Sequence, residues 1–249
     1  RMVVTGDVVT DRIESEEALR ALGEQWNPLR STLAPTWIEQ YARCPQEYFF
    51  AHVLGLTDLE EPTLDLTVEP QQFGAIVHRM LCDLYRGWAA RRDLDFGSMG
   101  DEDIPELIKD AAAWLDANRC GTALGWALLR YRALQCVHQL LKWERENAGS
   151  YRPYLFEMGF GREGAAEANA PAELALPEGQ VLRFRGVIDR VDRGPDCVRI
   201  IDYKTGKPRR AQTYSLKDKD LKLQLHVYAI AATAMTQLST ADARYLYLR

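Results

Sequence analysis

Apolar residues in the first half of the chain recur every three or four positions, the spacing of one face of a helix. The pattern is clearest in 71–92, where one stripe is formed by Phe73, Ile76, Val77, Met80, Leu81, Leu84, Tyr85 and Trp88. A helix is also predicted over 33–56, where Pro35 begins it and Pro45 either interrupts it or begins a second one. Two further helices are predicted over 105–148, separated near "NRCGTALG".

After residue 150 the pattern becomes that of strands, in which apolar and β-branched residues stand between turn signals. Strands are predicted over 154–163, 180–193, 196–206 and 243–249. A helix over roughly 217–237 precedes the last strand, and the acidic, weakly patterned residues 1–30 are predicted to be a tail or linker. A helical first half followed by a mixed sheet and a further helix indicates an α/β or α+β arrangement.

The composition is that of an ordinary globular protein. Of the 249 residues, 47% are hydrophobic and 27% are charged. No run of 18 apolar residues could cross a membrane, and the N-terminal residues lack the order of a signal peptide. The five cysteines are scattered and form no CxxC pair, which argues against a disulfide framework or a self-contained zinc site and favours a reducing, cytoplasmic setting.

Charge is distributed unevenly along the chain. The net charge of −5 argues against nucleic-acid binding over the whole surface. Between Arg183 and Lys222, however, twelve Lys and Arg residues stand against six Asp residues, a local balance of +6. This basic zone, which includes Lys207, Arg209 and Arg210, could hold a phosphate backbone, although a solvated charged face is the plainer alternative.

The two central predicted strands form a hairpin with many charged residues. With "RGPD" as a four-residue turn, antiparallel pairing sets Asp189 opposite Ile200. The same register sets Val187 opposite Asp202. Because side chains alternate along a strand and paired residues share a face, Asp189, Asp202 and Lys204 should lie on one face. The two carboxylates would then be diagonal neighbours, with Cα atoms about 7–8 Å apart, and could hold one metal ion.

Two acids on one face are a poor structural choice unless a cation separates them. Oxygen ligands of this kind suit Mg²⁺ or Mn²⁺, and Lys204 could orient a water or neutralise charge on a phosphate. A solvent-facing hairpin with cross-strand salt bridges would explain the same spacing, and both alternatives stay open on spacing alone.

Three further features could complete such a site. His78 lies at the edge of its helix's apolar stripe, where a histidine is either structural or a third metal ligand. Glu157 is an isolated acid in an otherwise apolar strand, and is either an edge charge or a ligand. Gln224 and Tyr228 are neighbours on one helix face, a polar pair that core packing could also explain.

Together these residues resemble the PD-(D/E)xK nuclease superfamily, specifically its RecB/AddB-type nuclease domain. The resemblance begins near residue 31, where "LAPTWIEQYARCPQEYFF" is similar to the family's opening helix. "FGAIVH" is similar to the motif that ends in a metal-binding histidine, "GVIDRVD" and "IDYKTGK" to the two core motifs, and "QLHVY" to the Q-x3-Y helix motif. As an ordered set these motifs are fairly specific. The resemblance implies a restriction-endonuclease-like mixed central sheet flanked by helices.

The resemblance also implies a role for each candidate residue. The ligands of Mg²⁺ or Mn²⁺ would be His78, Asp189, Asp202 and the backbone carbonyl of Tyr203. Lys204 would be the catalytic lysine beside the two catalytic aspartates. Gln224 and Tyr228 would support the site or touch DNA, and Glu157 would correspond to a family acid in the preceding strand.

Many relatives of this type hold a 4Fe–4S cluster through one Cys in the opening segment and three after the Q-x3-Y helix. Cys44 stands at the first of these positions, but no Cys follows Cys197. We therefore expect no cluster in this chain, and Cys44 would be an iron ligand only if a longer protein supplies the other cysteines. The chain ends in "ARYLYLR", a strand-like stretch, which suggests truncation at the C-terminus.

The expected molecule is a metal-dependent DNA nuclease domain over 31–249, helical over 31–150 and with its catalytic sheet over 151–249. The resemblance implies an exonuclease in a helicase-nuclease-like repair or recombination system. Its partners would be DNA, as single strands or duplex ends, and a helicase domain or subunit. The alternatives are a catalytically silent nuclease fold that binds DNA or scaffolds another protein, and a phosphohydrolase of small molecules.

Overall fold

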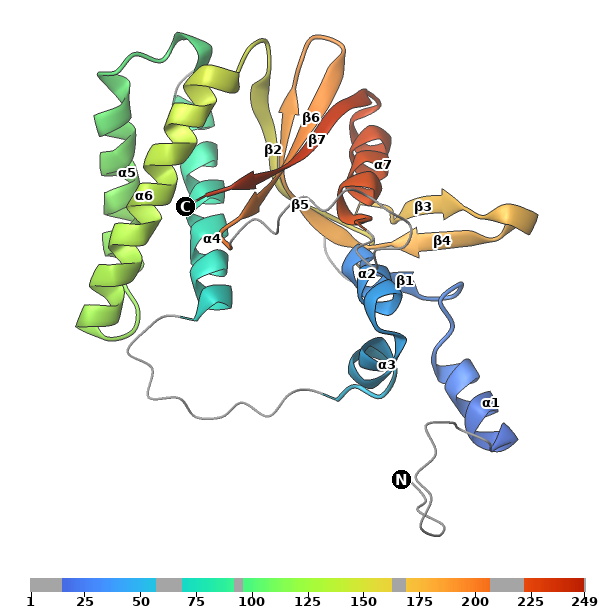
Figure 1. The fold of residues 1–249 in the computed structure, drawn as a ribbon. Helices are drawn as coiled ribbons and strands as arrows, with labels where there is room; N and C mark the ends of the chain where they lie inside the picture. The colour runs from blue at the N-terminus through green and yellow to red at the C-terminus, as the bar shows by residue number, and fades with distance from the viewer. Residues whose placement is uncertain (1–14, 57–68, 92–95, 163–168, 207–221, 249) are drawn as a thin grey trace.

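The computed structural model describes residues 15–56, 69–91, 96–162, 169–206 and 222–248. In these ranges a four-stranded sheet lies between a layer of long helices and a single helix, and a smaller three-stranded sheet stands beside it (Figure 1). This mixed, helix-flanked sheet confirms the predicted α/β class.

The N-terminal elements are short, and two of the helices begin at prolines. The elements are α1 (Glu16–Gln25), β1 (Thr32–Leu33), α2 (Pro35–Arg43), α3 (Pro45–Tyr48) and a π-helical turn (Phe49–Val53). Pro35 and Pro45 both stand in a first helical turn, where the missing N–H has no helical partner to lose, so Pro45 begins a second helix as one alternative predicted. α1 lies within the range predicted to be a tail or linker, and the Ser15 side chain caps it by accepting a hydrogen bond from the N–H of Ala18.

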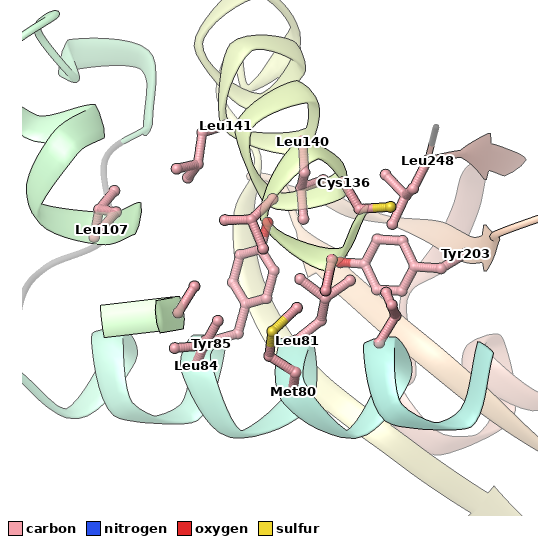
Figure 2. Packing of buried hydrophobic residues seen from close by; sticks show 14 of the residues in the cluster. Met80, Leu81, Leu84, Tyr85, Leu107, Cys136, Leu140, Leu141, Tyr203 and Leu248 are labelled. Carbon is pink, nitrogen blue, oxygen red and sulfur yellow. The ribbon is translucent and has the colours of Figure 1, made fainter. Parts of the chain in front are cut away.

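Three long helices cover one face of the main sheet. They are α4 (Pro70–Arg91), α5 (Asp103–Ala117) and α6 (Ala123–Asn147). The predicted stripe of α4 is buried throughout except at Ile76, which is partly buried against the same core. Figure 2 shows this stripe packing against α6, while Tyr203 and Leu248 reach the same core from the sheet. Among the described residues no helix is long and apolar enough to cross a membrane.

The main sheet has the order β2-β5-β6-β7. Its strands are β2 (Arg152–Phe160), β5 (Gly186–Arg193), β6 (Cys197–Lys204) and β7 (Ser239–Tyr247). The first three pair antiparallel, whereas β7 runs parallel to β6 because α7 (Gln224–Thr236) precedes it in the chain. Val227 and Ala231 of α7 pack on the sheet face opposite the long helices, against Val191 and Ile200.

The smaller sheet was not predicted as a separate unit. It has the order β1-β4-β3, with β3 (Ala172–Ala175) antiparallel and β1 parallel to β4 (Val181–Phe184). The single strand predicted over 180–193 is therefore divided at Arg185, whose N–H donates instead to the carbonyl oxygen of Leu33. The two parts of that stretch belong to different sheets.

The predicted register of the β5–β6 hairpin is wrong by two residues. Val191, and not Asp189, pairs with Ile200, and the last pair before the turn is Arg193 with Val198. The turn lies one residue further along than predicted, over 194–197, and it places Pro195 at the second position, where proline is favoured. Because a shift of two residues keeps the alternation of faces, the predicted sharing of one face by the two aspartates does not depend on the error.

Candidate active site

Three potential ligands from three distant segments come together at one edge of the main sheet. His78 on α4, Glu157 on β2 and Asp189 on β5 each offer one ligand atom, and these atoms lie within 4.8 Å of one another. Nδ1 of His78 lies 3.1 Å from Oδ1 of Asp189. A nitrogen ligand and two carboxylates form a donor set that suits Mg²⁺ or Mn²⁺, so the residues present fit a divalent cation.

Glu157 adopts a backbone conformation that is unusual for its residue type. Its φ is 50°, in the left-handed region, between residues of β2 that pair with Arg190 and Ile188. A non-glycine residue held there costs about 1–3 kcal/mol, and such outliers cluster at functional sites. The strained conformation therefore singles out the acid that lies close to His78 and Asp189.

Asp189 joins β5 to β6 through its side chain. Main-chain pairing of the two strands is described as far as Arg190 and Ile201. At the next position Oδ2 of Asp189 accepts a hydrogen bond of 2.7 Å from the N–H of Tyr203. The carboxylate takes the role of a main-chain acceptor, which fixes one of its oxygens while the other faces His78.

Asp202 and Lys204 lie beside this cluster, held by the first turn of α7. The ammonium of Lys204 forms an ion pair with Oδ2 of Asp202 and donates a 3.3 Å hydrogen bond to Oε1 of Gln224. Nε2 of Gln224 donates to Oδ1 of Asp202 and to the hydroxyl of Tyr228, at 2.9 Å in each case. The ammonium also lies 4.9 Å from the ring centroid of Tyr245. The predicted polar pair of α7 therefore contacts the candidate catalytic residues.

The buried oxygen of Asp202 is poorly satisfied by the chain itself. Within the described residues, Oδ2 has no partner with hydrogen-bond geometry, although the Lys204 ammonium lies against it. Burial and then the charge of Asp189 raise the pKa of Asp202 to about 6, while Lys204 and His78 act in the opposite direction. An incompletely satisfied anion next to a second carboxylate favours binding of an additional cation.

The pKa values of the cluster point in the same direction. Burial alone would lower the pKa of His78, but its hydrogen bond to Asp189 and the surrounding carboxylates outweigh burial and raise it. Burial and the charge of Asp189 raise the pKa of Glu157. Both shifts show that the site holds more negative charge than its own cations neutralise, so protons and metal ions should compete for it.

A cleft of about 540 Å³ opens onto the cluster. Its lining consists of Gly74, Ala75, His78, Arg79, Cys82, Asp83, Arg86 and Glu157. A Cβ at Gly74 would lie 3.2 Å from the hydroxyl oxygen of Thr205, so the glycine lets α4 approach the end of β6 closely. Two candidate ligands thus face a space that is open to a substrate, with two arginines on the same wall.

The structure brings together most of the predicted site residues, with one difference in grouping. Glu157, assigned only loosely from the sequence, belongs to the three-residue group with His78 and Asp189, whereas Asp202 lies next to that group. The signal for Glu157 was its isolation as an acid in an apolar strand. The predicted role of the Tyr203 carbonyl stays a prediction, because the described contacts involve the N–H and side chain of that residue.

Other predicted residues lie elsewhere or outside the described residues. Lys207, Arg209 and Arg210 fall in 207–221, which the structure does not describe. Cys44 caps α3, where its Sγ accepts a 3.5 Å hydrogen bond from the N–H of Glu47. None of the five cysteines forms a disulfide.

The basic zone seen in the sequence is partly internal. Arg190 and Arg199 are buried and ion-paired with Asp192, and Arg183 is paired with Glu173 on the surface. A local positive balance in the sequence therefore overstates the positive charge available to a phosphate backbone.

The raised pKa of Asp202 gives a pH-dependent stability. Between the ordinary value of 3.8 and the folded value of about 6, the folded state keeps a proton that the unfolded state has released, so stability falls as pH rises. Replacing Asp202 by Asn should therefore raise the free energy of unfolding of the metal-free protein at pH 8 by about 2–3 kcal/mol. Urea unfolding in EDTA at pH 4 and pH 8 measures this difference.

An exposed acid provides the control for that measurement. The pKa of Asp116 is lowered by its hydrogen bond to Arg130, so Asp116→Asn should not raise stability at pH 8. If Asp202→Asn and the wild type lose stability equally between pH 4 and pH 8, Asp202 does not titrate as stated.

Comparisons with known proteins agree with this geometry. A sequence model described as the PD-(D/E)XK nuclease superfamily matches residues 32–249. Two similar proteins are each named as a subunit of an ATP-dependent helicase/deoxyribonuclease: that of Moorella thermoacetica is 26% identical over 96% of the chain and 21% of its own length, and that of Clostridioides difficile is 26% identical over 100% and 22%. The chain thus spans about a fifth of these curated relatives. Since the superfamily match covers most of its length, the chain belongs to the PD-(D/E)XK nuclease superfamily, with the restriction-endonuclease-like fold predicted from its motifs.

Proposed function

We propose that residues 31–249 form a metal-dependent deoxyribonuclease domain that hydrolyses phosphodiester bonds. The supporting observation is the grouping of His78, Glu157 and Asp189 beside the Asp202–Lys204 ion pair, in a chain of a nuclease superfamily. Phosphodiester hydrolysis requires a nucleophilic water, a Lewis acid at the phosphate and stabilisation of negative charge in the transition state.

His78, Glu157 and Asp189 would hold the Mg²⁺ or Mn²⁺ ion, with Asp202 and the Tyr203 carbonyl next to it. A divalent cation in that position would polarise the scissile phosphate and make a bound water more acidic. The chain's own part is to supply several fixed oxygens. One oxygen of Asp189 is held by the N–H of Tyr203, and one oxygen of Asp202 is held by Gln224.

Lys204 would supply positive charge at the reacting phosphate. Its ammonium is restrained by Asp202, by Gln224 and by the ring of Tyr245, so it reaches the site without having to reorganise. A preorganised cation of this kind stabilises charge that develops in the transition state, or orients the attacking water. Gln224 and Tyr228 would support this arrangement from α7.

The substrate would approach along the cleft beside α4. Arg79 and Arg86 line it, which favours a polyanion, and Lys207, Arg209 and Arg210 are proposed as further DNA contacts. The helicase/deoxyribonuclease name of the relatives supports DNA as the substrate, and a helicase domain or subunit as the partner. An exonuclease acting in repair or recombination in the cytoplasm fits that name and the unpaired cysteines.

Cleavage of labelled DNA in the presence of Mg²⁺ or Mn²⁺ tests this proposal. Linear single strands should be shortened from an end, closed circles should persist, and EDTA should stop the reaction. Binding of DNA without cleavage would instead indicate a silent scaffold. Hydrolysis of a small phosphodiester without any action on DNA would indicate a small-molecule phosphohydrolase.

Replacing His78 by alanine should weaken Mn²⁺ binding by roughly 10–100-fold, the range for disturbing a metal's supporting groups. The thermal stability of the metal-free protein should change little, because the ring lies at the edge of the core and 28% of its side chain is exposed. Calorimetric titration with Mn²⁺ and a thermal melt in EDTA measure the two effects.

His138, a half-buried histidine on α6, is the matched control, and His138→Ala should leave Mn²⁺ affinity unchanged. A large fall in the melting temperature of His78→Ala with unchanged Mn²⁺ affinity would show that His78 is structural.

A further inference from the structure

The first turn of α7 is capped by a residue from a distant helix. The N-cap residue, Leu223, has no side-chain acceptor, and there is no acid in the first turn. Glu39 of α2 takes this role: its Oε1 accepts hydrogen bonds from the N–H of Leu223 at 2.7 Å and of Gln224 at 3.0 Å. A carboxylate at this position satisfies two otherwise unpaired donors and interacts favourably with the helix dipole.

Several contacts hold the Glu39 carboxylate in place. Its Oε2 lies 3.6 Å from the ammonium of Lys222, and 14% of its side chain is exposed. α2 lies next to the end of α7 at which that helix begins (Figure 1). Burial and then the charge of Glu39 raise the pKa of Tyr245, which places the carboxylate close to the tyrosine beside Lys204.

The main-chain N–H that Glu39 holds belongs to the residue that organises the candidate site. Gln224 donates to Asp202 and accepts from Lys204, so its side chain fixes the separation of these two groups. The hydroxyl of Tyr245 also lies 3.5 Å from Oε1 of Gln224. Since a side chain begins at its own Cα, the position of the first α7 turn decides where the Gln224 amide can reach.

We infer that Glu39 is a positioning residue for the candidate active site, acting through Gln224 on Asp202 and Lys204. The functional part of this inference rests on the proposed nuclease activity, whereas the structural part does not. Glu39 itself touches none of the candidate metal ligands in the described contacts; it sets the place of the amide that does.

Replacing Glu39 by alanine should lower kcat for DNA cleavage by about 10–100-fold, the range for residues that orient a metal site, with KM for DNA nearly unchanged. Glu39→Gln keeps an oxygen that can accept both N–H groups, and it should retain kcat within about 3-fold of the wild type. Glu39→Asp keeps the charge but withdraws it by one methylene, so it should resemble alanine.

A double-mutant cycle separates positioning from general destabilisation. If Glu39 acts through Gln224, adding Glu39→Ala to Gln224→Ala should lower kcat by less than about 2–3-fold more, because residues in one network are not additive. Additive losses would overturn the inference. Thr122→Ala is the matched control, since it removes the side-chain cap of α6: it should lower the melting temperature by about 2–4 °C and leave kcat unchanged.

NMR decides the structural part even without any nuclease activity. The side-chain amide of Gln224, assigned by comparison with Gln224→Ala, should give dispersed signals in the wild type, Glu39→Gln and Thr122→Ala. In Glu39→Ala and Glu39→Asp those signals should move to the positions of free glutamine amides. Unchanged Gln224 signals in Glu39→Asp would overturn the inference, whereas a wild type that shows these shifts but cuts no DNA would overturn only the proposed function.

Discussion

Replacing Lys204 by alanine is expected to lower the rate of DNA cleavage by about 10²–10³-fold, the loss typical for one group that stabilises transition-state charge. The ammonium lies within the site and is partly exposed, with 36% of its side chain accessible, so its removal creates no buried cavity. DNA affinity measured in EDTA and the circular dichroism spectrum should stay close to those of the wild type. Single-turnover cleavage with excess enzyme measures the chemical step directly.

Metal binding gives a second measurement on the same variant. Lys204 is a cation paired with Asp202, so it competes with a metal ion for that carboxylate. Lys204→Ala should therefore bind Mn²⁺ at least as tightly as the wild type, although it cuts far more slowly. Lys109, exposed on α5, is the control, and Lys109→Ala should change neither property. Cleavage at the wild-type rate by Lys204→Ala would show that the lysine is not catalytic.

The helical half could be predicted well from the sequence because its signals are local. The apolar stripe of α4 has helical period, and prolines stand at the starts of α2 and α3. Both features depend only on residues a few positions apart. The gap predicted between the two helices of 105–148 also agrees with the end of α5 at Ala117 and the start of α6 at Ala123.

The sheet half was less predictable because its pairing is non-local. The stretch 180–193 has one continuous strand pattern, yet its two parts pair with different partners and enter different sheets. The hairpin register depended on where the turn closes, and a shift by one residue in each strand changed every pair. The left-handed conformation of Glu157 has no sequence signal, since residues other than glycine rarely adopt it.

The charges of the hairpin have two different destinations. Asp189, Asp202 and Lys204 belong to the candidate site, as one alternative from the sequence proposed. Arg190 and Asp192 are instead buried with Arg199 in an internal ion network, which neither alternative considered. Their partner Glu144 comes from α6, more than forty residues earlier, so spacing within the hairpin could not reveal it.

This internal network joins the sheet to the long helices. Arg190, 1% exposed, forms ion pairs with both Glu144 and Asp192, each of them fully buried. The hydroxyl of Tyr85 on α4 donates to Glu144 at 2.5 Å, and the Arg190 guanidinium lies 4.5 Å from the centroid of the Tyr85 ring. Burial would lower the pKa of Arg190, but the charges of Asp192 and Glu144 outweigh it and raise the pKa, so the arginine stays charged.

Replacing Arg190 by methionine should lower the free energy of unfolding by about 3–5 kcal/mol, the usual cost of removing one partner from a buried ion pair. Asp192 keeps Arg199 at 2.6 Å, but Glu144 would be left with only neutral hydrogen bonds among its described contacts. Arg190→Lys should lie in between, because an ammonium cannot make the paired contacts of a guanidinium. Urea unfolding at pH 7.5 measures these differences, and Arg183→Ala, which breaks the exposed pair with Glu173, should cost less than about 1 kcal/mol.

A compensating substitution tests the reason for the loss. If the uncompensated charge of Glu144 is the cause, Glu144→Leu added to Arg190→Met should restore a large part of the lost stability, since apolar residues of similar volume often replace buried ion pairs without cost. If instead the loss comes from packing around the guanidinium, the second substitution should destabilise the protein further. The network also sits on the face of β5 opposite Asp189, one residue away from it. Restored stability together with lower Mn²⁺ affinity in the double variant would therefore show that the ion network, beyond stabilising the fold, holds Asp189 at the distance from His78 that metal binding needs.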